Sequence, residues 1–566
     1  MARAVPLLAA SVLACGAPTP HAAAPQGSAR TVTITIIGTN DLHGHIAPDA
    51  RGQGGVALLG GYIANVRAAR ARDGGGVLLL DGGDLFQGTL ESNLNEGAAV
   101  FAAYSALGYD AAAIGNHEFD FGPPGPRVTA GAEEDPRGAL RARCDEVSFP
   151  LLTANIIDES TGQPLAGSSH GRIIPSVMRE VAGVKFGVVG VATTDTPTST
   201  TVANFRGLRL MPLAEAIDRE VVRLRAAGAR VIVVASHAGL CRKVDDVESV
   251  QHSDSGEIVD VLRQVKERVD VVVAGHTHAG AVLRVGNTVI TEAWKYGRGF
   301  GRVDVVYDRS RDEVVHLELY QPRFIRSGDT YEGVLVEPDP RVNAVIAPYV
   351  AAAAEKRARR LGVRVLSPVR KSYDVESPFG NLSADLMRAA RPEADVIVTN
   401  GGGLRKDLST GDLTYGELFE AFPFDNFFAR ISVRGAELRR IFEANLATER
   451  GILTMAGMRL EARCDGARLD VRLLRDDGRL VTDDEQLVMV TSDFLASGGM
   501  DGALKSIDPT QVIIEEGNLI REAMIAELSR RGGTIDGGDR ALLDPARRRI
   551  AFPGRRPVIC GSAATH

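Results

Sequence analysis

Short apolar runs rich in β-branched side chains recur along the first half of the chain, and each ends in polar residues flanked by glycine. Their length and composition predict buried strands rather than helices. The runs are Thr31–Ile37, Val77–Leu80, Ala111–Ile114, Phe186–Val191, Val231–Ala235 and Val271–Ala274. Helical stretches lie between them, at Gly60–Arg72, Ala98–Leu107, Leu213–Ala227 and Glu257–Val265. This alternation predicts a layered α/β domain, in which ligands bind beyond the carboxyl ends of the strands.

The pattern changes in the second half of the chain. Pro338–Leu361 is rich in Ala and Arg and has a proline near its start, which predicts a helix that connects two domains. A strand-like run at Asp395–Thr399 then leads into a glycine-rich turn. We therefore expect a first domain over 31–335, a linker helix over 336–361, a smaller α/β domain over 362–553 and a tail over 554–566.

The first thirty residues have the layout of an export signal. Met1-Ala2-Arg3 precedes an apolar run that is too short to span a bilayer and that ends at Cys15. We expect a signal peptide over 1–15 of the lipoprotein type, with Cys15 carrying the lipid, followed by a flexible tether over 16–30. The alternative is cleavage near Ala22–Ala24 without a lipid. Either way the protein is expected to be exported, to the periplasm or to the outer-membrane or cell surface, with membrane contact only through an anchor at Cys15.

Composition limits the class of protein. The 566 residues include 65 Lys and Arg against 72 Asp and Glu, a net charge of −7, and 44% of residues are hydrophobic. These values are ordinary for a soluble globular protein and exclude a disordered or fibrous chain. The acidic balance argues against a nucleic acid polymer as partner, because binding phosphates requires a basic face.

The cysteines leave two interpretations open. Apart from Cys15, the chain has Cys144 and Cys241 in its first half and Cys464 and Cys560 in its second. This distribution predicts one disulfide in each half, as expected in an oxidising compartment. The alternative is four free buried thiols. No two cysteines are spaced as a thiolate zinc site requires.

Potential metal ligands follow the predicted strands one after another. They occur in Asn40-Asp41-Leu42-His43-Gly44, Asp81-Gly82-Gly83-Asp84, Gly115-Asn116-His117-Glu118-Phe119-Asp120, Ser236-His237 and Gly275-His276-Thr277-His278. One such turn is typical of a capping residue, whereas this series indicates a site. Oxygen and imidazole ligands without thiolates favour Zn, Mn, Fe or Co over calcium. An aspartate that bridges two cations about 3.5–4 Å apart is the usual centre of a dinuclear site.

These motifs resemble those of the calcineurin-like metallophosphoesterases. The resemblance implies a four-layer α/β/β/α sandwich with two divalent metal ions. One ion would be held by Asp41, His43, Asp84 and His278, and the other by Asp84, Asn116, His237 and His276. His117 is similar to the catalytic histidine of that family, which is not a ligand, and Asp120 would orient it.

A second set of motifs resembles the C-terminal domain of the 5′-nucleotidases. The set comprises Asn400-Gly401-Gly402-Gly403-Leu404-Arg405, Gly411-Asp412-Leu413-Thr414, Glu417-Leu418 and Pro423-Phe424. The resemblance implies that Phe424 and Phe494 enclose the base, that Asn400 and Arg405 contact the nucleotide and that Asp501 binds the ribose. Two departures stand out. Met500 interrupts the usual Gly-Gly-Asp-Gly, and no basic residue directly precedes Gly380-Asn381, so Arg370 or Lys371 would have to substitute.

The two resemblances together imply an exported 5′-nucleotidase. It would hydrolyse nucleoside 5′-monophosphates to nucleoside and phosphate with a hydroxide generated between the two metal ions. Other hydrolyses remain open on the same scaffold: cleavage of UDP-sugar or dinucleotide pyrophosphates, of 2′,3′-cyclic nucleotides or of sulfur esters. A surface binding protein without catalysis is a further alternative.

Overall fold

The structure is a computed structural model that describes residues 30–49, 51–125, 130, 133–167, 172–240, 249–251 and 254–561. The predicted signal peptide, nearly all of the predicted tether, Cys15 and Cys241 lie outside these residues. Within the described part of the chain, no helix combines the length and the apolar character that crossing a membrane requires.

The first domain contains two large β-sheets packed face to face. The strands of the first sheet are, in spatial order, β15 (Glu313–Phe324), β14 (Gly299–Asp308), β1 (Thr31–Thr39), β2 (Gly76–Asp81), β3 (Ala111–Ala113), β4 (Leu151–Leu152) and β6 (Ile173–Ile174). Those of the second are β12 (Gly280–Val285), β13 (Thr288–Ala293), β11 (Val271–Ala274), β10 (Val231–His237), β8 (Val184–Ala192) and β7 (Ser176–Val181).

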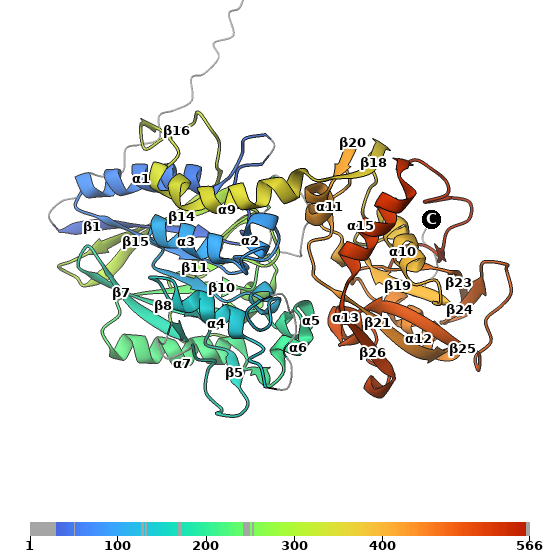
Figure 1. Cartoon of the computed structure of the whole chain (residues 1–566). Helices are drawn as coiled ribbons and strands as arrows, with labels where there is room; N and C mark the ends of the chain where they lie inside the picture. Colours follow the sequence, from blue (N-terminus) through green and yellow to red (C-terminus); the bar gives the residue numbers. More distant parts are fainter. Residues whose placement is uncertain are drawn as a thin grey trace, which may run out of the picture.

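Helices cover the outer face of each sheet. Alternate residues of β1 explain the layering: Ile34 and Ile36 belong to the apolar core between the sheets, whereas Ile37 packs in the core under the outer helices. Helices α1 (Val56–Arg72) and α3 (Ala98–Leu107) cover the first sheet, and α7 (Leu213–Ala226) and α8 (Glu257–Leu262) cover the second. The predicted four-layer α/β/β/α sandwich is confirmed (Figure 1).

Each predicted strand of the first half is present, and their ends are in register. Thr39 of β1 pairs with Asp81 of β2, and Ser236 of β10 pairs with Ala274 of β11, in parallel. Because parallel strands end at the same edge of a sheet, the turns that follow them are neighbours. Strands β12 to β15 carry no strand-end motif and were not among the predicted strands.

The second domain is a smaller α/β unit, as predicted. Its five-stranded sheet has the order β22 (Leu453–Ala456), β19 (Val396–Asn400), β25 (Gln486–Ser492), β21 (Phe427–Arg434) and β26 (Val512–Leu519). Two three-stranded sheets flank it: β20 (Gly411–Thr414), β18 (Arg360–Ser367) and β27 (Gly533–Asp536), and β24 (Arg468–Arg475), β23 (Met458–Asp465) and β28 (Ile550–Ala551). Its main helices are α10 (Pro378–Ala390), α11 (Tyr415–Ala421), α12 (Gly435–Leu446) and α15 (Ile520–Arg531).

Helix α9 (Pro340–Ala358) runs from the first domain to the second, within the predicted linker (Figure 1). The side chain of Asp339 caps it by accepting a hydrogen bond from the Arg341 N–H at 2.8 Å, and Pro340 occupies its first turn. Val342 and Ile346 are buried in the first domain's core, whereas Ala353 belongs to a core of the second. The helix is therefore anchored in both domains, while the predicted boundaries at 336 and 361 stay predictions.

The disulfide predicted for the second half is present, between Cys464 at the end of β23 and Cys560 in the tail. The prediction for the first half is wrong, because Cys144 is not in a disulfide. Cys144 lies on α4 (Gly138–Asp145) and is completely buried in the apolar core, where burial raises the pKa of its thiol above the usual range. It is therefore a packing residue rather than a reactive thiol.

Candidate active site

Five turns at the carboxyl edges of the two sheets bring the predicted metal ligands together. Asp41 and His43 follow β1, Asp84 follows β2, Asn116 follows β3, His237 ends β10, and His276 and His278 follow β11. Five of these residues have a left-handed backbone, with φ of 51° at Asp41, 48° at His43, 58° at Asp84, 79° at His276 and 62° at His278. Residues other than glycine rarely adopt this backbone conformation. Where they do, the strained backbone is often found at a functional site.

Asp41, His43 and His278 form one cluster whose polar atoms could hold a metal ion. The Nε2 atoms of His43 and His278 lie 3.3 Å apart, and Nε2 of His278 lies 3.4 Å from Oδ1 of Asp41. The three side chains are buried. The cluster thus brings two imidazole nitrogens and one carboxylate oxygen to within 3.3–3.4 Å of a neighbour. This arrangement fits three ligands around one cation better than a hydrogen bond between the two imidazoles.

A second cluster consists of Asp84, His237 and His276. Nε2 of His237 lies 3.1 Å from Oδ2 of Asp84 and 3.0 Å from Oδ1 of Asn116. The same Oδ2 atom of Asp84 lies 3.7 Å from Nε2 of His43 in the first cluster. Asp84 is therefore the carboxylate positioned between the two clusters.

Hydrogen bonds to backbone carbonyls orient the rings of His43 and His237. Nδ1 of His43 donates to the Gln87 carbonyl at 3.0 Å, and Nδ1 of His237 donates to the Gly82 carbonyl at 2.8 Å. With Nδ1 held in this way, Nε2 of each ring faces the centre of the site, the usual orientation of a metal-binding histidine. Asp41 is oriented in turn by Asn40 Nδ2 at 2.7 Å and by the His276 N–H at 2.9 Å.

The electrostatics of the site also favour a cation. Burial raises the pKa of Asp41 to about 6, with His237 opposing the rise and Asp84 adding to it. Burial acts to raise the pKa of Asp84 as well, but His237 and His117 outweigh it and hold that pKa well below the usual value. For His237, burial acts to lower the pKa, and the Asp84 carboxylate reverses this and raises it to about 10. Two carboxylates, those of Asp41 and Asp84, are therefore buried close together, and such a pair requires positive charge nearby.

Two buried glutamates fasten the ligand-bearing turns to one another. The Glu118 carboxylate accepts hydrogen bonds from the N–H groups of Asp84 at 2.9 Å, Leu85 at 2.7 Å and Gly115 at 2.6 Å, and so joins the turns after β2 and β3. Glu292 accepts bonds from the Leu240 N–H at 2.8 Å, the Thr277 hydroxyl at 2.7 Å and the Ala279 N–H at 3.1 Å. Burial raises the pKa of each glutamate to about 8.

Neither glutamate was among the predicted site residues. Glu118 is part of the Gly-Asn-His-Glu motif, so its position in the sequence could have identified it as a site residue. Glu292 lies in β13 far from any strand-end motif, and nothing local marks it.

We expect Glu118→Ala to lower both the melting temperature and the metal content per chain. The substitution leaves three buried N–H groups without an acceptor, at a cost of about 1–3 kcal/mol for each unsatisfied group. Thermal unfolding and elemental analysis of the purified variant measure the two effects. Glu118→Gln, which keeps an amide oxygen in place, should lose less of both. Full metal content in Glu118→Ala would contradict a positioning role for this carboxylate.

His117 lies beside both clusters and is held from two sides. Its Nδ1 lies 2.5 Å from Oδ2 of Asp120, whose other oxygen accepts from the Thr200 hydroxyl at 3.1 Å. On the other side of the ring, Nη2 of Arg405 donates to Nε2 of His117 at 3.1 Å. Arg405 comes from the second domain, so this contact joins the two halves of the chain at the site.

The structure brings part of the predicted nucleotide-binding set to this point. The Phe424 ring is stacked with the His117 ring at a centroid distance of 6.0 Å, and the Arg405 guanidinium lies 5.3 Å from the Phe424 centroid. Asn400 is buried at the end of β19. Phe494, in α13 (Asp493–Ala496), packs against the second domain's core, and no ring contact joins it to Phe424 in the described part of the chain.

Asp501 lies in the short helix α14 (Gly499–Gly502), and its side chain is outside the described part of the structure. The preceding Met500 has a left-handed backbone with φ of 55°. Helix α14 packs against α5 (Thr196–Ser199) of the first domain. The departure from the expected glycine pattern therefore falls where the two domains touch.

Comparison with known proteins agrees with both halves of the structure. Residues 34–280 match the family model of calcineurin-like phosphoesterases, and residues 352–505 match that of the 5′-nucleotidase C-terminal domain. The chain belongs to the metallophosphoesterases that carry a 5′-nucleotidase C-terminal domain. It is thus a metal-dependent phosphoester hydrolase, and the family expected from the strand-end and glycine-rich motifs is confirmed.

Among curated relatives, a probable 5′-nucleotidase of Treponema pallidum is 26% identical over 521 residues, covering 80% of this chain and 84% of that protein. Endonuclease YhcR of Bacillus subtilis is 27% identical over 425 residues, which are 74% of this chain but only 33% of that protein. The crystal structure of a 5′-nucleotidase precursor from Thermus thermophilus matches 92% of this chain and 99% of its own length, with a TM-score of 0.71 and 23% identity. That likeness concerns the fold.

Proposed function

We propose that the protein is an exported 5′-nucleotidase, which hydrolyses nucleoside 5′-monophosphates to nucleoside and phosphate. The observation that carries this proposal is the meeting of Arg405 and Phe424, from the nucleotidase-type domain, with His117 beside the metal-binding clusters. A phosphate at the clusters and a nucleoside on the second domain would then belong to one molecule of substrate.

The proposed cofactor is a pair of divalent cations, drawn from Zn, Mn, Co or Fe. The first would be held by Asp41, His43, Asp84 and His278, and the second by Asp84, Asn116, His237 and His276. Such a pair activates water as a nucleophile and neutralises the phosphate oxygens. Oδ2 of Asp84 lies 3.1 Å from Nε2 of His237 and 3.7 Å from Nε2 of His43, which supports the assignment of Asp84 as the bridge.

Side chains of this protein would perform the remaining steps. His117, oriented by Asp120, stabilises the charge that develops on the phosphate or protonates the departing ribose oxygen. Arg405 is placed to pair with phosphate oxygens, since a guanidinium matches their geometry. His117 lies beside His43 and Asp84, and Arg405 is hydrogen-bonded to His117.

Base binding requires the domains to separate from the arrangement described above. Phe424 lines a cavity of only about 20 Å³ between the domains, with Asp120 and Thr201 on the first-domain side. Pockets that hold small ligands are typically about 300–1,000 Å³. We infer that a nucleotide enters when the second domain swings about α9. Phe424 and Phe494 would then enclose the base, Asn400 would contact the nucleotide and Asp501 would bind the ribose.

Phe424→Ala and Phe494→Ala are each expected to weaken nucleotide use by roughly 5- to 150-fold, since stacking a base on an aromatic ring contributes about 1–3 kcal/mol. Cleavage of 4-nitrophenyl phosphate should fall much less, because that substrate needs only the metal centre. The measurement is the ratio of kcat/KM for AMP to kcat/KM for the aryl phosphate. If both activities fall together, or neither falls, while the melting temperature is unchanged, the two-domain binding mode is wrong.

Export is supported by the N-terminal sequence and by the Cys464–Cys560 disulfide, since structural disulfides persist in oxidising compartments. We expect processing at Cys15 with a lipid on that residue. Mass spectrometry of the mature N-terminus tests this prediction. An unmodified terminus near residue 25 would contradict the lipid anchor but would still agree with export.

A substrate panel tests the activity as a whole. AMP should be the preferred substrate over UDP-glucose, a 2′,3′-cyclic nucleotide and a thiosulfonate, with enzyme whose metal content has been measured. If the enzyme prefers one of the other three substrates, hydrolysis of that substrate replaces 5′-nucleotidase as the proposed activity. No turnover of any of them by a fully metallated chain would favour a binding protein.

A further inference from the structure

A buried glutamine of the metal-bearing domain has a side-chain amide without a hydrogen-bonding partner. Gln87 is only 2% exposed, and neither its amide nitrogen Nε2 nor its amide oxygen Oε1 is hydrogen-bonded to any residue that the structure describes. An amide offers two N–H donors and one oxygen acceptor, and buried polar groups are nearly always paired. Leaving both atoms unpaired costs free energy of folding, so packing does not explain a glutamine at this position.

The backbone of Gln87 is anchored next to the metal-binding clusters. The residue lies in the loop between β2 and α2 (Leu90–Asn93), three positions after Asp84. Its carbonyl accepts the hydrogen bond from Nδ1 of His43 at 3.0 Å, and the N–H of the next residue, Gly88, donates to Oδ1 of Asn93 at 2.9 Å. The unpaired amide therefore belongs to a fixed loop whose backbone already serves the site.

The side chain of Gln87 lines the small cavity of about 20 Å³ between the domains. Asp120, which holds His117, and Phe424, which we propose to bind the base, line the same cavity. Asn93 lines it too, but its amide is paired with the Gly88 N–H and, at 3.4 Å, with the Pro423 carbonyl. Gln87 thus presents unpaired donors and an unpaired acceptor where the proposed catalytic pair and the proposed base-binding ring meet.

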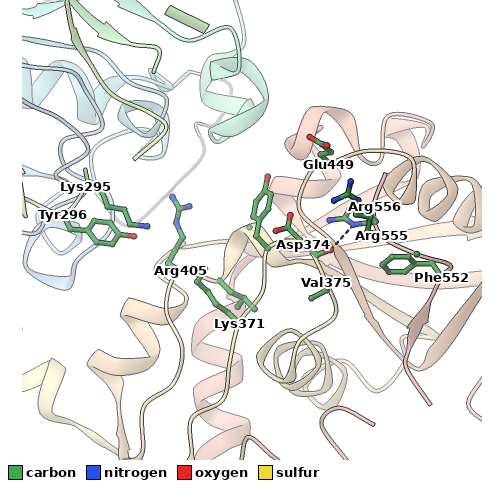
Figure 2. A pocket seen from close by; sticks show the side chains of 14 residues that line it. Lys295, Tyr296, Lys371, Asp374, Val375, Arg405, Glu449, Phe552, Arg555 and Arg556 are labelled. Carbon is green, nitrogen blue, oxygen red and sulfur yellow. Dashed lines mark hydrogen bonds between the residues drawn. The ribbon is translucent and has the colours of Figure 1, made fainter. Parts of the chain in front are cut away.

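The lining of this cavity suits an uncharged part of a substrate better than a phosphate. Among the described residues no Lys or Arg lines it, whereas three carboxylates do, those of Asp120, Asp425 and Asp493. The basic side chains of the domain boundary surround a separate cavity of about 620 Å³ that Gln87 does not line, and they include Lys295, Lys371 and Arg405 (Figure 2). A phosphate dianion beside Gln87 would meet carboxylates and, because it only accepts hydrogen bonds, would leave Oε1 unpaired.

The two unpaired atoms of Gln87 match a group that both donates and accepts hydrogen bonds. A ribose hydroxyl is such a group, and so is the amino edge of adenine, with which a glutamine amide forms two hydrogen bonds at once. Both groups belong to the nucleoside part of a nucleotide.

We propose that Gln87 is a specificity-determining residue, whose side-chain amide hydrogen-bonds the nucleoside part of the substrate. The inference rests on the proposed nucleotidase function and extends it, since the metal-bearing domain then recognises the nucleoside as well as the phosphate. The amide gains its hydrogen bonds only when a nucleoside is present. Gln87 therefore favours nucleotides over phosphate esters that lack one.

The test is Gln87→Met, which replaces the amide by an apolar side chain of similar length and keeps the backbone carbonyl that orients His43. We expect kcat/KM for AMP to fall by roughly 10-fold, the size expected when two hydrogen bonds are lost. For 4-nitrophenyl phosphate, which has no nucleoside, kcat/KM should stay within about twofold of the wild-type value. Metal content should be unchanged. The melting temperature should equal or exceed that of the wild type, because the variant removes two unpaired buried polar atoms.

Substrate analogues show which group of the nucleoside is bound. Wild type and variant are compared on 2′-deoxy-AMP, 3′-deoxy-AMP and IMP, in which an oxygen replaces the amino group of adenine. The analogue that lacks the partner of Gln87 should be poor for the wild type and should lose little further in Gln87→Met. If the variant loses the same factor on AMP and on all three analogues, Gln87 does not contact the nucleoside directly and the inference is overturned.

The matched control is Gln264→Met, the same substitution at an exposed glutamine after α8 that does not line the cavity. It should leave both activities and their ratio unchanged. A ratio of AMP to aryl phosphate kcat/KM in Gln87→Met within about twofold of the wild-type ratio overturns the inference, given the size expected of the lost hydrogen bonds. If the melting temperature falls as well, the amide is structural.

Failure of the nucleotidase function is distinguishable from failure of this inference. In that case the wild type cleaves 4-nitrophenyl phosphate but not AMP, and the readout becomes the inhibition constants of adenosine and uridine against aryl phosphate hydrolysis. At least one of these constants should be weaker in Gln87→Met by roughly the same factor of 10. No inhibition of the wild type by either nucleoside, or unchanged constants in the variant, overturns the role of Gln87.

Discussion

Asp84→Ala and Asp84→Asn are both expected to abolish turnover and to reduce the metal content of the protein. In the proposed site Asp84 serves both cations, so its loss removes a ligand from each. The same side chain also accepts the His117 N–H at 2.9 Å through Oδ1, which holds the turn after β3 in place. Each remaining ligand in the proposed set contacts one cation only, so its replacement should be less severe. Steady-state kinetics and elemental analysis of the purified variants measure the two effects.

Asp81→Asn is the matched control, because Asp81 is a similarly buried carboxylate that lies at the end of β2, three residues before Asp84. Its partners are structural: the Thr39 hydroxyl at 2.6 Å, the Tyr104 hydroxyl at 2.9 Å and the Gly83 N–H at 2.8 Å. This control should lose stability and keep its metal. Asp84→Asn with full metal content and measurable turnover would show that no carboxylate bridge is needed.

His117→Ala is expected to retain both metal ions and to lose rate by roughly 10²- to 10⁴-fold, the usual size of an acid–base or electrostatic contribution. The loss should appear in kcat, because the ring acts on charge that develops during the reaction. Asp120→Asn should give a smaller loss in the same parameter, since the ring would remain but lose the carboxylate that orients it.

Metal content distinguishes this role from ligation. His117 also forms a cluster with His43 and Asp84 that could hold an ion. If His117→Ala loses metal, His117 is a ligand, and the assignment of His237 or His276 to the second ion has to be revised.

Much of the first domain could be predicted from local patterns. The apolar runs before Asp41, Asp84 and Asn116 are strands, and the polar residues directly after them lie at one edge of the fold. This works because strand length, β-branched composition and the glycine that ends a strand are properties of adjacent residues. The motifs occupy the same adjacent positions, so the family could be identified without any long-range information.

Contacts between distant segments could not be predicted in this way. Glu292 holds the turn of His276 and His278, but it stands in a strand whose sequence differs in no visible way from other buried strands. Cys144 was expected in a disulfide because of its place along the chain, whereas packing buries it in an apolar core. Cysteine spacing restricts possible pairs and leaves the choice among them to the packing.

The sequence alone thus determined the strand-end motifs of the first domain, the presence of a second α/β domain and the family. Only the tertiary structure decided how the two domains meet. Arg405 reaches His117 across 288 positions of sequence, and helix α14 of the second domain packs against α5 of the first. The physical reason is that periodicity and turn chemistry act over a few residues, whereas the approach of two domains depends on the summed packing of distant segments such as α9, α14 and α5.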